Sequence, residues 1–153
     1  MTLLCTVRDC RRPLIREARR LVCPRGHSFD IARSGYCNLL QPQDRRSRNP
    51  GDTKEAVAAR RRFADRGFLE PWSGALQRAL SGLKPAAPLL DVGCGDGYHL
   101  DLLRRTLQAE AHGVDISVPA IEAAAKRYRE CQFVVANADR FLPYADGPFA
   151  TVT

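Results

Sequence analysis

Pro88-Leu89-Leu90-Asp91-Val92-Gly93-Cys94-Gly95-Asp96-Gly97 reads as a short apolar strand that runs into a glycine-rich loop. Leu100, Leu103 and Leu107 then recur at steps of three and four residues, a spacing that predicts a helix. Strand, glycine loop and helix in this order are typical of α/β domains that bind nucleotide-like ligands, because glycines let the backbone approach a ligand closely. The stretch therefore predicts an α/β fold with a parallel sheet.

The pattern continues towards the C-terminus. Residues 111–115 (AHGVD) and 131–136 (CQFVVA) predict two more strands, and the segment between them predicts a helix capped by Ser117. Residues 149–153 read as the opening of a fourth strand. Strands that alternate with helices form parallel sheets with right-handed crossovers. Since a three-stranded parallel sheet would leave an open edge, we expect a truncated domain that needs further strands.

The loop indicates which cofactor the domain takes. A dinucleotide fingerprint has the spacing G-x-G-x-x-G, whereas here a single residue separates Gly95 from Gly97, and position 98 is Tyr. The motif resembles motif I of S-adenosylmethionine-dependent class I methyltransferases, whose cofactor carries an ammonium and a sulfonium that acids attract. We expect Asp115 to accept the ribose hydroxyls and Asp139 to hold the adenine amino group. The expected loop residues are Asp91, Gly93, Gly95, Asp96 and Gly97.

Three cysteines and a histidine near the N-terminus have metal-ligand spacing: Cys5-x4-Cys10-x12-Cys23-x3-His27. Two close pairs separated by about a dozen residues are typical of zinc knuckles, and a site with thiolate and imidazole ligands favours Zn²⁺. The opposing interpretation is four reduced side chains without metal, since the x4 spacing is wider than the common x2. The remaining cysteines are expected to be small buried hydrophobes: Cys37, Cys94 and Cys131.

Composition and charge limit the classes of function that the chain can have. The chain has 153 residues, 44% hydrophobic, and a formal net charge of +7. Residues 1–66 carry a net +9 and residues 67–153 a net −2, and 21 of the 24 basic residues are Arg. Such asymmetry favours a nucleic-acid-facing front, because the Arg fork fits phosphate, although a GC-rich genome would also raise the Arg share. The sequence shows no bilayer-spanning run and no signal peptide, so we expect a cytoplasmic protein without membrane contact.

Residues 41–52 (QPQDRRSRNPGD) predict an exposed linker, and a helix is expected over 53–66 with Asp52 as its N-cap and Glu55 as the reciprocal partner. The linker and this helix hold the densest positive charge of the chain. The functional interpretation is contact with RNA phosphates, and the opposing one is a solvated helix face. The candidate RNA-binding residues are Arg45, Arg46, Arg48, Arg60, Arg61 and Arg62.

A second helix is expected from about Pro71 to Gly82. Its apolar stripe would consist of Trp72, Leu76, Ala79 and Leu83, with Trp72 as a core anchor. The expected organisation is a zinc module over 1–40, a basic linker with helices over 41–86, and the first half of a Rossmann-like cofactor domain over 87–153.

Several segments together resemble one family, the bacterial 23S ribosomal RNA (guanine-N1)-methyltransferases, which are RlmA-like. The resemblance covers nearly all of the chain and is carried by these segments: Cys23-Pro24-x-x-His27-x-Phe29-Asp30, Gly35-Tyr36-x-Asn38-Leu39-Leu40, Arg45-Arg46-Ser47-Arg48-x-Pro50-Gly51-Asp52, Ala59-Arg60-Arg61-x-Phe63 and Asp91-Val92-Gly93-Cys94-Gly95. A generic methyltransferase would share only the last of them.

The resemblance implies that the Cys/His set binds zinc and that Gly95 and Asp96 contact S-adenosyl-L-methionine. It also implies methylation of guanine N1 in a 23S rRNA hairpin, and it leaves a homodimer open. The family often has a Tyr near the cofactor in a Gly-His-Tyr segment, and Leu69 stands at that place here. The catalytic residue is unknown, because no residue is a defensible base for the guanine N1 proton, and we expect that group beyond Thr153.

Two other functions remain as alternatives. One is a zinc-ribbon RNA-binding protein whose truncated methyltransferase domain is inactive. The other is a nicotinamide-linked oxidoreductase, which Tyr98 and the acid at Asp96 disfavour. Binding of S-adenosylmethionine, or its failure, distinguishes the methyltransferase from both.

Overall fold

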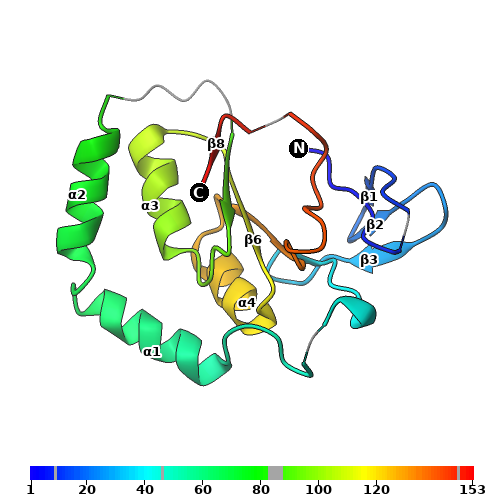
Figure 1. The fold of residues 1–153 in the computed structure, drawn as a ribbon, viewed down its shortest axis with the longest axis horizontal. Coiled ribbons are helices and arrows are strands. Elements are labelled where there is room, and N and C mark those ends of the chain that lie inside the picture. The colour runs from blue at the N-terminus through cyan, green and yellow to red at the C-terminus, as the bar shows by residue number, and fades with distance from the viewer. Residues whose placement is uncertain (9, 46, 83–87, 148) are drawn as a thin grey trace.

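The computed structural model describes residues 1–8, 10–45, 47–82, 88–147 and 149–153. Within these ranges it contains a small antiparallel sheet and a larger parallel one, shown to the right and at the centre of Figure 1. The small sheet has the strand order β1-β2-β3 and consists of β1 (Ile15–Glu17), β2 (Arg20–Val22) and β3 (Ser28–Asp30). It belongs to the N-terminal module that carries the Cys/His set.

The larger sheet has the strand order β4-β7-β6-β5-β8, and each of its neighbouring pairs is parallel. Its strands are β4 (Cys37–Asn38), β5 (Leu89–Val92), β6 (Ala111–Asp115), β7 (Gln132–Val135) and β8 (Thr151–Val152). Helix α3 (Tyr98–Leu107) connects β5 to β6, and α4 (Val118–Arg127) connects β6 to β7. The predicted α/β fold is therefore confirmed, including the fourth strand at 151–152.

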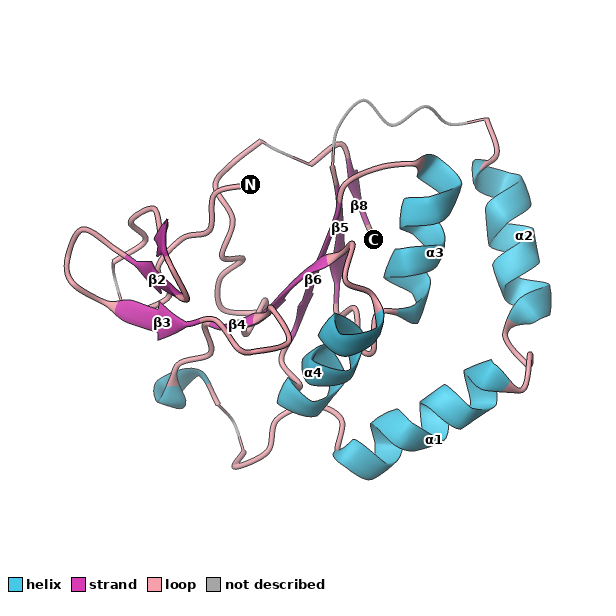
Figure 2. Cartoon of the chain, turned by 180° about the vertical axis from the view of Figure 1, so that it is seen from behind, coloured by secondary structure: helices cyan, strands magenta, loops and turns pink. Residues whose placement is uncertain are grey.

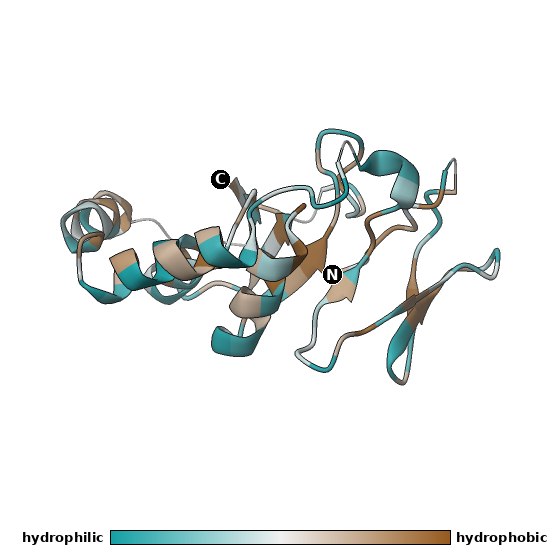
Figure 3. Cartoon of the chain, turned by 90° about the horizontal axis from the view of Figure 1, so that it is seen from below, coloured by the Kyte–Doolittle hydropathy of each residue, from teal (hydrophilic) through white to brown (hydrophobic). Residues whose placement is uncertain are grey.

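The two faces of the parallel sheet pack against different partners (Figure 2). Phe133 and Val135 of β7 join the core beneath α3 and α4, whereas Val134 between them joins a second core with residues of the N-terminal module. Alternate residues of a strand point to opposite faces, so this alternation follows from the strand geometry. Figure 3 shows the central strands largely in brown, whereas the helices carry both teal and brown segments, as expected for amphipathic helices that cover an apolar sheet.

Strand β4 joins the N-terminal module to the parallel sheet. Cys37 and Asn38 pair with Val134 and Val135, and the Leu39 amide donates to the Val135 carbonyl at 2.8 Å. The expected boundary at residue 40 thus falls just after a strand that belongs to the larger sheet. Two residues carry no periodicity that a sequence pattern could detect, so this strand arises from tertiary pairing alone.

The N-cap of helix α1 (Lys54–Asp65) lies one residue later than predicted. Thr53 is the N-cap and its hydroxyl accepts from the Ala56 amide at 3.3 Å, so the prediction of Asp52 as N-cap was wrong. The Asp52 carboxylate instead pairs with Arg60 at 2.7 Å, and its carbonyl accepts from the Ser117 hydroxyl at 2.7 Å. The predicted cap of α4 is confirmed, since the Ser117 hydroxyl accepts from the Ala120 amide at 3.2 Å.

Helix α2 (Glu70–Leu80) buries a different stripe from the predicted one. Its inward side is formed by Ser73, Leu76 and Leu80, of which Ser73 is buried and the two leucines pack against the core. Trp72 is 50% exposed and stacks on His99 with ring centroids 4.3 Å apart, so its prediction as a core anchor was wrong. Ala79 is exposed, and Leu83 lies outside the described residues. Ser73 rather than Trp72 therefore faces the core, and its hydroxyl lies 3.2 Å from the Tyr98 hydroxyl.

None of the helices in the described ranges has the length and apolar character that crossing a bilayer requires.

Candidate functional site

The predicted Cys/His set forms one compact cluster. The donor atoms of Cys5, Cys10, Cys23 and His27 all lie within 4.8 Å of one another, and the three cysteines are buried. Cys10 Sγ and Cys23 Sγ are 3.8 Å apart, and His27 Nδ1 lies 3.4 Å from Cys5 Sγ and 3.3 Å from Cys23 Sγ. A tetrahedral zinc ion with ordinary bond lengths requires ligand separations of about 3.5–3.8 Å. The cluster therefore fits Zn²⁺ through three thiolates and His27 Nδ1.

Two tight turns place these ligands. The Cys10 amide donates to the Val7 carbonyl at 3.0 Å, and the Gly26 amide donates to the Cys23 carbonyl at 2.8 Å. Although burial opposes ionisation of the Cys23 thiol, the backbone groups of His27 and Arg25 lower its pKa to about 7. A thiol that ionises near neutral pH is suited to bind a metal, because the ligand form is the thiolate.

The second site surrounds the glycine loop at the carboxyl ends of β5 and β6. The Gly93 amide donates to the Val114 carbonyl at 2.7 Å, which fixes the start of the loop against β6. Gly97, the N-cap of α3, has a φ of +76°, and a Cβ there would lie 3.0–3.1 Å from Phe133, Ala124 and Tyr128. Only glycine fits this backbone and this packing. Gly97 therefore fixes the turn from the loop into α3.

Asp115, at the end of β6, is connected to the glycine loop. Its Oδ2 accepts from the Gly95 amide at 2.9 Å and its Oδ1 accepts from the Ser117 amide at 2.7 Å. Each carboxylate oxygen can accept a further hydrogen bond. The arrangement thus orients Asp115 and leaves acceptor capacity for hydroxyl groups, as its predicted contact with a ribose requires.

Asp91 lies in β5 directly before the loop and is partly buried. Burial raises the pKa of its carboxyl to about 6, the negative charge of Asp115 adds to the rise, and a hydrogen bond from Thr153 opposes it. Asp91 and Asp115 therefore place negative charge in one region, at the carboxyl ends of β5 and β6. A cation placed there would be attracted to both, which suits the ammonium or sulfonium of the predicted cofactor.

Asp96 is buried within the loop and pairs with α1. Arg61 Nη2 lies 2.9 Å from Asp96 Oδ2, and the same nitrogen donates to the Asp96 carbonyl at 3.2 Å. Arg61 Nη1 also donates to the Tyr128 hydroxyl at 3.2 Å. Asp96 Oδ2 accepts no well-directed hydrogen bond among the described residues, although the guanidinium offsets its charge. This buried acceptor is the observation that best fits a donor group supplied by a cofactor.

The arginine cluster divides into two groups. Arg60 pairs with Asp52 at 2.7 Å and Arg61 with Asp96, so these two guanidinium groups have acidic partners, and phosphate contact by Arg60, Arg61 and Arg62 stays a prediction. Sequence spacing could not reveal this because Asp96 is 35 residues from Arg61, and Asp52 lies before the N-cap of α1, outside its helical register. Arg61, which the sequence reading assigned to RNA, contacts the glycine loop from α1.

Three exposed arginines of the linker and α1 pair with no acid among the described residues: Arg45, Arg48 and Arg62. Arg45 and Arg48 line a groove of about 390 Å³ together with Lys54 of α1. Arg46, the remaining candidate, lies outside the described residues. RNA binding by this group remains a prediction.

Two further predicted cofactor residues, Leu69 and Asp139, lie in other parts of the fold. Leu69 is half-buried where α1 meets α2, and its carbonyl accepts from the Ser73 amide at 2.8 Å. Asp139 is exposed in the turn after β7, and its amide donates to the Asn137 side chain at 3.1 Å. Asn137 also donates to the Asp44 carbonyl at 2.8 Å, which attaches the linker to the end of β7. The sequence reading missed this Asn, whose only signal was its place directly after a predicted strand.

Comparison with known proteins assigns the two parts of the chain. Residues 4–48 match the family model described as "RlmA, N-terminal", a zinc ribbon, and residues 89–153 match the model described as "Methyltransferase domain". The chain is 36% identical over 146 residues to the 23S rRNA (guanine(748)-N(1))-methyltransferase of Streptomyces fradiae, covering 92% of this chain and 51% of that protein. It is 37% identical over 150 residues to a candidate 23S rRNA (guanine-N(1)-)-methyltransferase of Micromonospora griseorubida, covering 88% and 50%. The chain thus spans about half the length of the curated relatives it matches.

Solved structures share the fold. The plantazolicin methyltransferase BamL, crystallised with a substrate analogue and S-adenosylhomocysteine (SAH), matches with a TM-score of 0.50 and 26% identity, covering 64% of this chain and 39% of that one. A methyltransferase bound to the Haloferax volcanii Trm112 activator matches with a TM-score of 0.50 and 24% identity, covering 63% and 42%, and this likeness shows the fold alone.

Proposed function

The chain belongs to the family that joins an RlmA-type zinc ribbon to a methyltransferase domain, and we propose that it acts in S-adenosylmethionine-dependent methylation of guanine N1 in 23S rRNA. The observation that carries this proposal is the arrangement around the glycine loop. Two carboxylates, Asp91 and Asp96, and the oriented acceptor Asp115 surround a backbone that a ligand can approach closely. This set of acceptors suits a ligand with a positive amino acid end and a ribose.

The cofactor, when bound, supplies a methyl group made electrophilic by its positive sulfur. The chain's own residues bind and orient it. Asp115 would accept ribose hydroxyls, Asp96 Oδ2 would accept from the ammonium, and Asp91 would add negative charge near the cationic centre. Gly93 to Gly97 would bring backbone amides close to the ligand. By resemblance to the family, Leu69 would lie near the cofactor and Asp139 would hold the adenine amino group.

The zinc cluster and the arginines would act on the RNA side. A tetrahedral zinc site with four protein ligands is structural, because it leaves no position for a substrate. The exposed Arg45, Arg48 and Arg62 carry charge without acidic partners among the described residues, so they can contact phosphates. We place the activity in the cytoplasm, where ribosomal RNA is the partner.

Calorimetry and methyl transfer test this function. We expect the zinc-loaded chain to bind SAH, and the Asp115→Ala variant to bind it at least about tenfold more weakly, since it loses an oriented charged acceptor. Tritium transfer from S-adenosylmethionine to a 23S rRNA transcript, with N1-methylguanine located as a reverse-transcription stop, tests the reaction itself.

The outcomes separate the competing functions. SAH binding together with a stop at a guanine supports the methyltransferase. RNA binding by a chain that binds no SAH overturns it and identifies a zinc-ribbon RNA-binding protein. Preferential binding of NAD would overturn it in favour of an oxidoreductase.

A further inference from the structure

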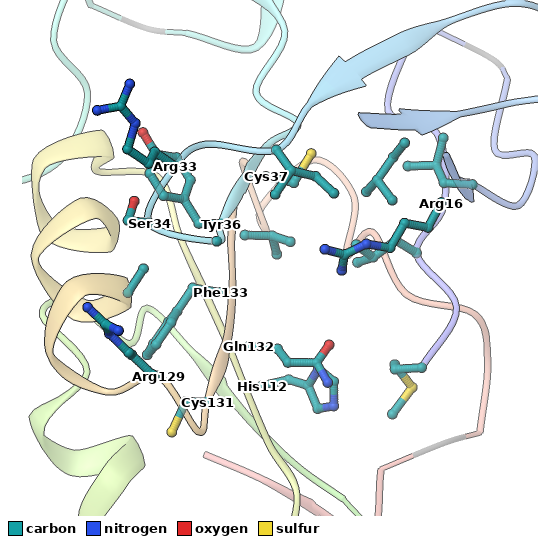
Figure 4. Close-up of a pocket in the computed structure, with 18 of the residues that line it drawn as sticks. Arg16, Arg33, Ser34, Tyr36, Cys37, His112, Arg129, Cys131, Gln132 and Phe133 are labelled. Atoms are coloured by element: carbon teal, nitrogen blue, oxygen red, sulfur yellow. The ribbon is translucent and has the colours of Figure 1, made fainter. Parts of the chain in front are cut away.

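A cavity of about 580 Å³ lies between the N-terminal module and the parallel sheet (Figure 4). Its floor includes His112, the second residue of β6, and Gln132, the first residue of β7. These residues mark the amino ends of the strands, whereas the glycine loop follows the carboxyl end of β5. The cavity is therefore at the opposite edge of the sheet from the cofactor site. Its size is within the range of small-molecule sites, about 300–1,000 Å³.

The rim of the cavity is positively charged. Arg16, Arg33 and Arg129 line it from three separate segments, namely β1, the loop before β4 and the end of the α4 region, as Figure 4 shows. All three side chains are exposed, and none forms an ion pair within the described part of the chain. No Asp or Glu is among the described residues that line the cavity. Three unpaired guanidinium groups around one opening favour phosphate groups, which they can bind in a bidentate manner.

The interior of the cavity is aromatic and uncharged. Tyr36, Phe133 and Tyr144 line it and are buried. Burial is the largest influence on the His112 ring and lowers its pKa, although the hydrogen bond to Glu110 at 2.9 Å opposes the shift. A neutral ring with aromatic neighbours suits a planar nucleobase, because aromatic side chains can stack on any of the bases.

We propose that this cavity binds one nucleotide of an RNA strand, with the flanking phosphates on Arg16, Arg33 and Arg129 and the base among the aromatic side chains. The inference rests on the proposed function only in that RNA is taken as the polyanion. The RNA would then contact the chain at both edges of the sheet. Neither the family models nor the relatives' names assign this cavity a ligand.

Matched charge variants test the proposal. The probe is a fluorescein-labelled single-stranded 12-nucleotide RNA, and anisotropy gives its affinity as a function of KCl concentration. In the cavity variant Arg16, Arg33 and Arg129 are changed to Gln. The control variant changes the exposed Arg19, Arg66 and Arg78 to Gln, so that the net charge is the same.

Loss of three single-strand phosphate contacts should flatten the slope of log K against log [KCl] by about 2. We expect this flattening in the cavity variant and a nearly unchanged slope in the control. Equal effects in both variants would show attraction by overall charge and would overturn the proposal.

A steric variant tests the interior separately. Gln132 is exposed at the cavity, so Gln132→Phe would fill space without changing charge or adding a polar group, and it gives up only the exposed hydrogen bond to Glu110 at 3.1 Å. We expect at least about a tenfold loss of RNA affinity, comparable to the loss of one stacked base. Unchanged affinity would contradict a bound base.

Two further measurements separate this inference from the proposed function and from a free nucleotide ligand. SAH affinity, read by calorimetry, should stay unchanged in the cavity variant. If SAH binds but the cavity and control variants bind RNA alike, the cavity proposal fails while the methyltransferase proposal stands. If GMP displaces the RNA probe at concentrations near the affinity of the RNA itself, the ligand is a free nucleotide and the proposal is wrong.

Discussion

Arg61 of α1 reaches into the glycine loop and pairs with the buried carboxylate of Asp96 at 2.9 Å. The Arg61 side chain is 16% exposed and that of Asp96 is 4% exposed, so water screens the pair only weakly. The guanidinium also contacts Tyr128, whose hydroxyl accepts at 3.2 Å and whose ring centroid lies 5.5 Å away. One residue of a helix outside the sheet therefore connects the loop to the end of α4.

Replacing Arg61 should destabilise the chain because it leaves the Asp96 carboxylate buried without its partner. We expect Arg61→Ala to lower the free energy of unfolding by about 3 kcal/mol, measured by urea denaturation. Arg61→Lys should recover only part of this loss, because an ammonium cannot contact both Asp96 and Tyr128 as a guanidinium does.

Arg62→Ala is the matched control on the same helix and should change the free energy by no more than about 0.5 kcal/mol. A double-mutant cycle with Asp96→Asn should give a coupling energy of about 1–3 kcal/mol. A coupling energy near zero would mean that the observed pairing contributes nothing to stability.

Cofactor affinity should depend on pH through Asp91. Its pKa of about 6 means that the carboxylate charge disappears as the pH falls through 6. We therefore expect SAH to bind more weakly at pH 5 than at pH 7.5 in calorimetry, because its ammonium loses an attractive partner. Asp91→Asn should bind more weakly at pH 7.5 and should lack this step; a step that persists in the variant would assign it to another group.

The same raised pKa has the opposite effect on the folded chain. Because the folded-state pKa lies above the ordinary value for Asp, about 3.9, the folded state binds more protons between those two values. The contribution to stability is full below pH 4 and is lost as the pH rises through 6. Urea denaturation of the native chain should show this component, and Asp91→Asn should remove it.

Gly97 should not tolerate a side chain. Gly97→Ala would combine an unfavourable φ with contacts of 3.0–3.1 Å to three core side chains, so we expect a loss of about 2–4 kcal/mol in the free energy of unfolding. Gly82→Ala is the control, because open space surrounds that position, and its effect should stay within about 1 kcal/mol. Similar losses in both variants would show that crowding at the loop is not the cause.

Removal of a zinc ligand should destabilise more than the N-terminal module. Cys23→Ala should reduce bound zinc well below about one equivalent and lower the melting temperature of the whole chain. Cys131→Ala removes a buried thiol outside the cluster and should leave zinc content unchanged. Metal analysis and circular dichroism read the two effects, and full zinc content in the Cys23→Ala variant would contradict the four-ligand site.

Local patterns predicted the elements that depend on local rules. The glycine loop, the alternating strand and helix periods, and the spacing of Cys5, Cys10, Cys23 and His27 all predicted structure that is present. The N-terminal ligands could be paired from sequence because each close pair lies on its own turn.

Features that depend on distant partners could not be predicted in this way. Arg61 looked like one of three equivalent basic residues, and only the packing of α1 beside the glycine loop distinguishes it from Arg62. The buried side of α2 includes the contact between Ser73 and Tyr98 of α3, and the helical spacing of apolar residues cannot predict that contact. Strand β4 has two residues and is defined solely by its pairing with β7.

That pairing gives the N-terminal module a protective role. Without Cys37 and Asn38 alongside it, β7 would present the unpaired amides and carbonyls of an apolar Phe-Val-Val strand to solvent. Such a strand is a template for edge-to-edge association between molecules. Ile31 of the N-terminal module forms an isolated bridge with Cys37 of β4. Loss of the metal would therefore weaken the pairing of β4 with β7 as well as the Cys/His cluster. The first observable result would be aggregation rather than simple unfolding.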